Sequence, residues 1–349
     1  MSGMVRSEIE ALAAYVPGEQ PLGGKFIKLN TNENPYPCSP RVPQAITRVC
    51  QQGLGRYPDP SARAFRLRAG EVLGVDPEWI LCGNGSDDIL TIVTRGLVGA
   101  GQVVRYPMPS YVLYRTLAGI QGARVQEIPF QRDWSLSPRF TSPERDLKLV
   151  YLANPNSPSG TVIAPDEIRQ IAARLPCPLL VDEAYVDFAE QNSLSLVAEE
   201  PRIMVARSMS KSYALAGLRF GFLVAQPQLV EQLMKVKDSY NCSAMAIAGA
   251  TAAIDDQAWR AENRGKILAT RARLTDQMRQ LGFESVPSQA NFVWNTHASR
   301  PVRPLCQALR EAGILVRYME YPGWGDGLRI SVGTDPQIDA LLVLLKGMV

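Results

Sequence analysis

Seven short apolar segments, separated by helical patterns, constrain the fold of this chain more than any other feature. The intervening segments, such as residues 86–97 and 164–175, carry apolar residues three and four positions apart, which is typical of helices packed on one side. Alternation of strand and helix predicts an α/β fold, with a mostly parallel central sheet covered by helices on both faces. The segments predicted as buried strands are residues 79–83, 102–106, 123–128, 147–153, 178–184, 202–208 and 219–225.

The pattern changes after residue 255. A long helical stretch covers residues 258–283, short apolar segments follow it, and a final helix is predicted over residues 334–345. This combination indicates a smaller α+β domain, on which we expect the first thirty residues to pack. The predicted organisation is therefore a large domain over residues 30–255 and a small domain made of residues 1–29 and 256–349.

Charge and hydropathy exclude several classes of protein. The chain has 37 basic and 34 acidic side chains and no run of five basic residues, so we expect no binding to nucleic acid. No stretch approaches eighteen uninterrupted apolar residues, and the N-terminus lacks the apolar core of a signal peptide. These features predict a cytoplasmic protein that does not bind membranes.

Cysteine and histidine are too sparse for most metal sites. The six cysteines are scattered along the chain, and His297 is the single histidine. We therefore predict no metal site, and a catalytic Ser-His-Asp triad would depend on His297 alone. Acid and base chemistry is expected from an amine, a phenol or a carboxylate.

Four polar loops are predicted to meet at one edge of the sheet. "GNGSDD" (83–88), "NPNSPSG" (154–160) and "SMSK" (208–211) each follow a strand, and "DEAY" (182–185) ends another. Ligands of open α/β sheets bind beyond the carboxyl ends of the strands. Each loop alone has an ordinary structural interpretation, as a turn, a helix cap or a solvated lysine. Only their joint occurrence at strand ends indicates a ligand site.

The chemistry of these loops fits pyridoxal 5'-phosphate. Gly85 and Ser86 open a helix and can bind a phosphate, which the hydroxyls of Ser208 and Ser210 and the guanidinium of Arg219 would complete.

Three further side chains match the rest of that cofactor. The buried carboxylate of Asp182 suits a protonated ring nitrogen, and Tyr185 can bind a ring oxygen. Lys211 supplies an amine that can react with an aldehyde. A Schiff-base lysine with an aspartate at the pyridinium nitrogen is the arrangement that binds this cofactor.

The chain resembles the fold-type I, pyridoxal-phosphate-dependent aminotransferases of class I/II, and within them the histidinol-phosphate aminotransferases. The resemblance runs nearly end to end. Besides the four loops, it rests on "LNTNENPYP" (29–37), "RYPDP" (56–60), "PSYVLYR" (109–115), "VDEAYVDF" (181–188), "RSMSKSYALAGLRFGF" (207–222), "SQANFVW" (288–294) and "GLRISVGT" (327–334).

The resemblance implies a role for individual residues at the cofactor. Lys211 would form the imine with the aldehyde and then carry a proton between substrate and cofactor, with Asp182 and Tyr185 as the other catalytic residues. Asn156 would contact the ring oxygen, although many relatives have asparagine where this chain has Ser157, so the register of this contact stays open. The implied cofactor-binding residues are Gly85, Ser86, Asp87, Tyr111 (stacked on the ring), Asn156, Asp182, Tyr185, Ser208, Ser210, Lys211, Arg219 and Tyr57.

The resemblance also implies a homodimer and a substrate site. Tyr57 matches a tyrosine that reaches the phosphate of the neighbouring subunit, so the two active sites would be shared. Arg329 would grip the carboxylate of the amino donor, and Arg317 and Tyr36 are further candidates for binding substrate.

The implied reaction is a transamination between L-glutamate and imidazole acetol phosphate, which yields 2-oxoglutarate and L-histidinol phosphate and serves histidine biosynthesis. An aromatic amino-acid aminotransferase and a phosphothreonine decarboxylase share the same cofactor and fold and remain alternatives. A transcription regulator is disfavoured because no helix-turn-helix pattern precedes the shared region. A protein with a vestigial site would stay colourless when the cofactor is added.

Overall fold

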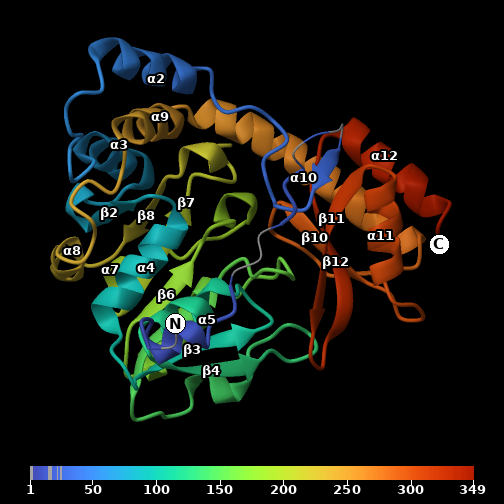
Figure 1. Ribbon diagram of the computed structural model, residues 1–349, viewed down its shortest axis with the longest axis horizontal. Helices are drawn as coiled ribbons and strands as arrows, with labels where there is room; N and C mark the ends of the chain where they lie inside the picture. Colours follow the sequence, from blue (N-terminus) through green and yellow to red (C-terminus); the bar gives the residue numbers. More distant parts are fainter. Residues whose placement is uncertain (1–2, 15–17, 22, 24–25) are drawn as a thin grey trace.

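Two β-sheets, each with its own helices, make up the structure, which is a computed structural model describing residues 3–14, 18–21, 23 and 26–349 (Figure 1). The larger sheet contains all seven segments predicted as strands. Its strand order is β2-β8-β7-β6-β5-β3-β4. The strands are β2 (Ile80–Gly83), β3 (Val103–Met108), β4 (Arg124–Pro129), β5 (Leu147–Ala153), β6 (Leu179–Asp182), β7 (Ile203–Ser208) and β8 (Gly221–Val224).

The sheet is mostly parallel, as predicted, with one exception. Strand β8 runs antiparallel to both of its neighbours, β2 and β7. The other six strands therefore point the same way, and their carboxyl ends lie at one edge of the sheet. The loops after β2, β3, β5, β6 and β7 all leave from this edge, as the sequence predicted for four of them.

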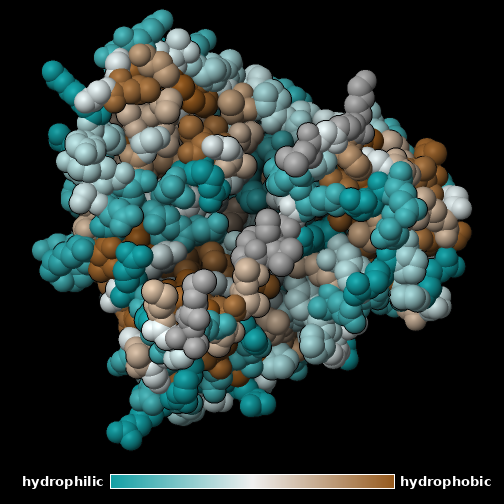
Figure 2. Space-filling model, viewed as in Figure 1, coloured by the Kyte–Doolittle hydropathy of each residue, from teal (hydrophilic) through white to brown (hydrophobic). Residues whose placement is uncertain are grey.

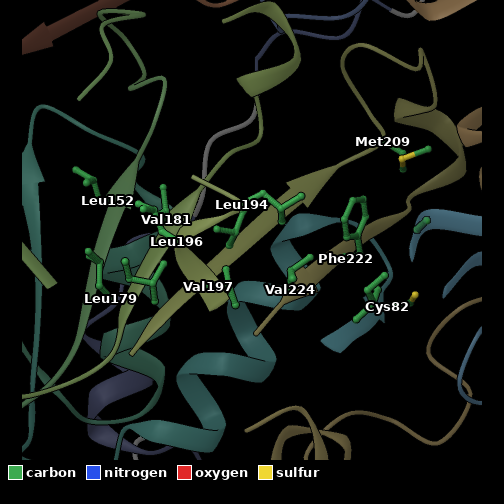
Figure 3. Close-up of a cluster of buried hydrophobic side chains, with 14 of the residues drawn as sticks. Cys82, Leu152, Leu179, Val181, Leu194, Leu196, Val197, Met209, Phe222 and Val224 are labelled. Carbon is green, nitrogen blue, oxygen red and sulfur yellow. The ribbon is translucent and has the colours of Figure 1, made fainter. Parts of the chain in front are cut away.

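Helices cover both faces of the large sheet because successive strand residues point to opposite sides. On one face, Leu179 and Val181 pack in a cluster with side chains such as Val197 of α7 (Figure 3). On the other, Leu180 packs with residues of α4 and α5. Helices of the first face are α2 (Arg41–Gln52), α3 (Arg63–Leu73), α6 (Pro165–Arg174), α7 (Leu196–Glu199) and α9 (Ala244–Ile254); those of the second are α4 (Ser86–Leu97), α5 (Leu113–Ile120) and α8 (Pro227–Met234).

The smaller sheet has the order β1-β11-β12-β10-β9, and it is antiparallel except for the pairing of β1 with β11. Helix α10 runs from the end of α9 toward this sheet (Figure 1), and its Leu274 and Met278 pack in the same cluster as α11 and α12. The elements are β1 (Ile27–Leu29), β9 (Glu284–Ser285), β10 (Phe292–Thr296), β11 (Ile314–Tyr321), β12 (Gly325–Ser331), α10 (Gln257–Gln280), α11 (Arg303–Glu311) and α12 (Asp335–Lys346).

The N-terminal segment divides between the two sheets. Strand β1 joins the small sheet, in line with the expectation that the first thirty residues pack there. Helix α1 (Ser7–Glu10) instead contacts α5 of the large sheet, and Arg6 Nη2 donates to the carbonyl of Ile120 at 2.7 Å. For this part of the chain the expectation was wrong, because apolar periodicity does not reveal which surface a four-residue helix covers. The exact domain boundaries stay a prediction.

In the part of the chain that the structure describes, four short 3₁₀ helices complete the elements: η1 (Pro77–Trp79), η2 (Pro138–Thr141), η3 (Val186–Phe188) and η4 (Ala216–Leu218). Among the described residues, no helix is long and apolar enough to span a bilayer. The same residues contain no cluster of three potential metal ligands. All six cysteines are free thiols.

Candidate active site

A cavity of about 540 Å³ lies where the carboxyl ends of the large sheet face the small sheet. The loops after β2, β5, β6 and β7 line it together, and β11 and β12 of the small sheet contribute its opposite wall. The strand-end rule therefore predicted the convergence correctly. The lining includes Ser86, Asp87, Tyr111, Asp182, Tyr185, Ser208, Ser210, Lys211, Arg219, Arg317 and Arg329.

One end of the cavity is shaped to admit a small anion. Gly85, with φ 93°, precedes α4, whose first-turn amides lack partners within the helix. A Cβ on Gly85 would lie 2.6 Å from Arg219 Nη2, and one on Gly221 would lie 2.6 Å from the amide nitrogen of Ser86. The absence of side chains at these glycines thus lets the Arg219 guanidinium and strand β8 approach the start of α4 closely. Arg219 Nη1 lies 3.5 Å from Ser210 Oγ, which places cation, hydroxyl and helix N-terminus together.

Asp87 lies at the rim of this anion site. Its carboxylate accepts hydrogen bonds from the hydroxyl of Tyr111 at 3.1 Å and from Arg219 Nη2 at 3.4 Å. Arg219 and Asp87 are both about half exposed, so this ion pair contributes little to stability and leaves the arginine available for a stronger anion.

Among the described residues that line the cavity, Asp182 is the carboxylic acid whose pKa is strongly shifted. Its side chain is buried, and this burial raises its pKa to about 6, since a carboxylate loses hydration there. The hydroxyl of Tyr114 at 2.8 Å and the amide of Ala184 at 3.2 Å donate to its oxygens and oppose that rise. A carboxylate with so few partners is suited to a cationic ligand group.

Sequence reasoning missed Tyr114. Its ring stacks on Tyr151 with centroids 4.4 Å apart and meets Tyr111 edge-on at 5.7 Å, so its hydroxyl is held against Asp182. The motif "PSYVLYR" contained the residue, but a tyrosine at a buried helix position gives no sign of its partner. Tyr114 is also a packing residue, since its buried ring stacks on Tyr151.

Lys211 projects into the cavity beside Tyr185. Its Nζ lies 3.3 Å from the carbonyl oxygen of Thr31 and 5.6 Å from the centre of the Tyr185 ring. Among the described residues, it is the one lysine that lines the cavity.

The "LNTNENPYP" segment holds Lys211 and Tyr185 in place. Asn34 Nδ2 donates to the carbonyls of Lys211 and Ser212, and Asn32 Nδ2 donates to the hydroxyl oxygen of Tyr185 at 3.0 Å. These asparagines were part of a recognised motif but were assigned no role from sequence.

Asn156 lies behind the cavity wall. Its side-chain amide donates to the carbonyl of Pro109 and to Ser159 Oγ, and its oxygen accepts from Ser110 Oγ. Ser157 lines the cavity instead, and its hydroxyl accepts from Arg329 Nη1 at 2.9 Å. Of the two candidates for the ring-oxygen contact, the geometry therefore favours Ser157.

Two arginines form the wall opposite Lys211. Arg317 of β11 and Arg329 of β12 are directly paired in the antiparallel ladder, so they lie on the same face of the small sheet. Arg329 Nη2 also donates to the carbonyl of Asn30 at 3.2 Å, and its guanidinium lies over the Phe292 ring. Two adjacent cations form a binding site for a carboxylate or a phosphate.

Tyr36 and Tyr57 are not among the described residues that line the cavity. Tyr36 packs with Phe188 and lies under the ammonium group of Lys266. Tyr57 is 80% exposed and stacks on Tyr240 with ring centroids 4.4 Å apart. His297 packs edge-on against Phe283.

Comparison with known proteins identifies the family. Residues 24–345 match the model of the aminotransferases of class I and II. A histidinol-phosphate aminotransferase of Rhodopirellula baltica is 54% identical over 342 residues, which cover 98% of this chain and 94% of that one. Histidinol-phosphate aminotransferase 1 of a Nostoc species is 46% identical over 100% of this chain and 99% of that one.

A solved structure agrees with these relatives. The crystal structure of histidinol-phosphate aminotransferase from Sinorhizobium meliloti, in complex with pyridoxal-5'-phosphate, superimposes with a TM-score of 0.89 at 26% identity and 99% coverage of both chains. The expected fold type is thereby confirmed. The chain belongs to the class I and II aminotransferases.

Proposed function

We propose that this chain is a pyridoxal-phosphate-dependent histidinol-phosphate aminotransferase, which works in the cytoplasm in histidine biosynthesis. The observation that carries the proposal is the pairing, in one cavity, of Lys211 and Asp182 with two adjacent arginines across from them. Two relatives that are 54% and 46% identical along nearly the whole chain are named histidinol-phosphate aminotransferases, which supports the assignment of the substrate.

The residues of the cavity fit the cofactor group by group. The start of α4 at Ser86, against which Gly85 lets Arg219 lie closely, suits the phosphate, and Asp182 suits the ring nitrogen. Tyr185 would contact the ring oxygen, and Lys211 would hold the aldehyde. Tyr111 would lie against the ring.

The cofactor supplies an electron sink for the charge that develops at the substrate carbon. The protein supplies the rest. Lys211 Nζ, which faces the cavity beside Tyr185, accepts and returns the proton of that carbon. Buried Asp182 would keep a proton on the ring nitrogen, and the enclosed walls would hold the reactants in a fixed orientation.

The paired arginines give a rationale for the substrates. Glutamate presents a carboxylate and histidinol phosphate presents a phosphate, and the forked guanidinium groups of Arg317 and Arg329 can bind either one in turn. Alternating anionic substrates at one site is what a ping-pong transamination requires.

A substrate panel tests this assignment. With 2-oxoglutarate as amino acceptor, we expect kcat/KM for histidinol phosphate to exceed that for phenylalanine by at least about 100-fold, because a doubly charged phosphate pairs with two arginines more strongly than the single charge of the phenylalanine carboxylate does. Decarboxylation of phosphothreonine would be absent. Faster turnover of phenylalanine would favour an aromatic aminotransferase, and release of carbon dioxide from phosphothreonine would favour the decarboxylase.

We also propose that the protein is a homodimer in which Tyr57 completes the phosphate site of the neighbouring subunit. The surface near Tyr57 supports this, because Leu54 and Tyr240 are exposed as well, and apolar residues gather over α2 and α9 (Figure 2). Large exposed aromatic and aliphatic groups of this kind mark protein interfaces.

Light scattering is expected to give twice the chain mass of 38.3 kDa. In that dimer, Tyr57→Phe should weaken binding of the cofactor by about 10-fold, the effect of one hydrogen bond to a charged group. Tyr318→Phe, which removes the hydroxyl of a half-buried tyrosine that bonds Glu320 and points to the opposite face of β11 from Arg317, is the matched control. A monomer with full cofactor affinity would contradict the proposal.

A further inference from the structure

Asn32 is a buried residue whose contacts join the small sheet to the cavity. It is 1% exposed and has φ 55°, a left-handed conformation that asparagine tolerates better than most residues. Its amide nitrogen donates to Ser331 Oγ at 2.8 Å, and its carbonyl accepts from Asn291 Nδ2 at 3.0 Å. These two hydrogen bonds, together with the left-handed conformation, fix the backbone of Asn32 in place.

The hydroxyl of Ser331 orients the side-chain amide of Asn32. Ser331 Oγ already accepts from the Asn32 backbone, and it donates its single proton to Asn32 Oδ1 at 3.0 Å. Turning the amide over would take the acceptor away from this buried proton, which costs free energy. Asn32 Oδ1 therefore faces Ser331, and Nδ2 faces Tyr185.

This orientation determines how Tyr185 forms hydrogen bonds. Asn32 Nδ2 donates to the Tyr185 hydroxyl oxygen at 3.0 Å, and a phenol has only one proton of its own. That proton cannot return to Asn32 Nδ2, which is a donor. Tyr185 lines the cavity, so the direction left for its proton is toward a ligand.

We propose that Asn32 is a positioning residue that makes Tyr185 a hydrogen-bond donor to the ring oxygen of the bound cofactor. The inference rests on the proposed function, because it needs an anionic oxygen opposite Tyr185. Donation by Asn32 also polarises the phenol, which strengthens the bond that Tyr185 gives.

Replacement of Asn32 by aspartate tests the polarity with little change in shape. The carboxylate cannot donate, and it would accept the Tyr185 proton and draw it away from the cavity. Aspartate also tolerates the left-handed backbone. The readout is a spectrophotometric pH titration of the coloured adduct between the cofactor and Lys211.

We expect Asn32→Asp to raise the pKa of this adduct by about one unit. A donor to the ring oxygen stabilises the state with more negative charge on that oxygen, which is the deprotonated adduct, so loss of the donor favours the protonated state. Tyr185→Phe should raise the pKa in the same direction. Asn32→Asp added to Tyr185→Phe should then produce a smaller shift than Asn32→Asp alone, because only the charge of the new carboxylate still acts.

Ser331→Ala provides a second, milder variant, because it removes the proton that orients Asn32 while leaving Asn32 itself in place. A smaller upward shift is expected. Thermal unfolding without cofactor shows which variants fold. The control is Asn295→Asp, which changes a buried asparagine bonded to Ser285 elsewhere in the small sheet. It should leave the adduct pKa unchanged.

Two results would overturn the inference. The first is an unchanged adduct pKa in folded Asn32→Asp or, if that variant does not fold, in Ser331→Ala. The second is a shift from Asn32→Asp that is equally large when Tyr185 is already phenylalanine. Failure of the proposed function looks different, since the wild-type protein would then form no coloured adduct at all.

Discussion

Replacement of Lys211 by alanine is expected to reduce turnover by about 10⁴-fold or more, without unfolding the protein. The loss combines the covalent anchor of the cofactor with the base that moves the substrate proton. Lys211 is only half-buried and forms one long hydrogen bond, to Thr31, so its removal costs the fold little. Steady-state assays with histidinol phosphate and unfolding curves measure the two effects separately.

The control for this variant is Lys235→Ala, which removes an exposed lysine bonded only locally, to Gln232. It should retain full activity. A small primary amine added to Lys211→Ala should restore part of the rate, because it can enter the space vacated by the side chain. Near-normal turnover in Lys211→Ala would contradict the assignment, as would borohydride labelling that maps to another lysine.

The position of Lys211 could be predicted from the sequence because the residue follows the carboxyl end of a strand in a mostly parallel sheet. Each buried strand ends in a polar segment, and parallel strands bring those ends to one edge, so Asp182, Ser208 and Lys211 converge once the strands are recognised. Apolar periodicity does not carry strand direction, and the reversal of β8 was therefore not predicted.

Contacts between residues far apart in sequence could not be predicted from the pattern of strands and helices. Tyr114 reaches Asp182 across 68 positions, and Asn32 reaches Tyr185 across 153. Such pairs depend on how helices and sheets pack, and single residues show no periodic signal for them. Asn156 illustrates a finer limit, since a one-residue difference along a loop decides whether a side chain faces the cavity.

Asp182→Asn is expected to stabilise the cofactor-free protein at pH 8 while removing most of its activity. Burial raises the pKa of Asp182 in the folded protein to about 6, against 3.8 for an aspartate exposed to water in the unfolded chain. A folded-state pKa that is raised stabilises the fold below pH 3.8, and this contribution is lost as the pH rises through 6. Above that pH, wild-type protein carries the cost of a buried charge, up to about 3 kcal/mol, which the neutral amide avoids.

Activity should change in the opposite direction. An amide cannot keep the proton on the ring nitrogen, so kcat is expected to fall by about 100-fold or more, as when one preorganised charge is removed from an active site. Asp166→Asn, which removes an exposed carboxylate on α6 paired with Arg169, should change neither property.

Denaturant unfolding of the cofactor-free proteins at pH 5 and pH 8 measures the stability effect. The free energy of unfolding should fall between these pH values by about 1.4 kcal/mol more in wild type than in Asp182→Asn, because only wild type has the carboxyl that ionises. Tyr114→Phe should widen the wild-type difference, since it removes a hydrogen bond that opposes the rise in the Asp182 pKa. Equal pH dependence in all three proteins would show that Asp182 is already ionised at pH 5, and that its burial is compensated by partners other than the cofactor.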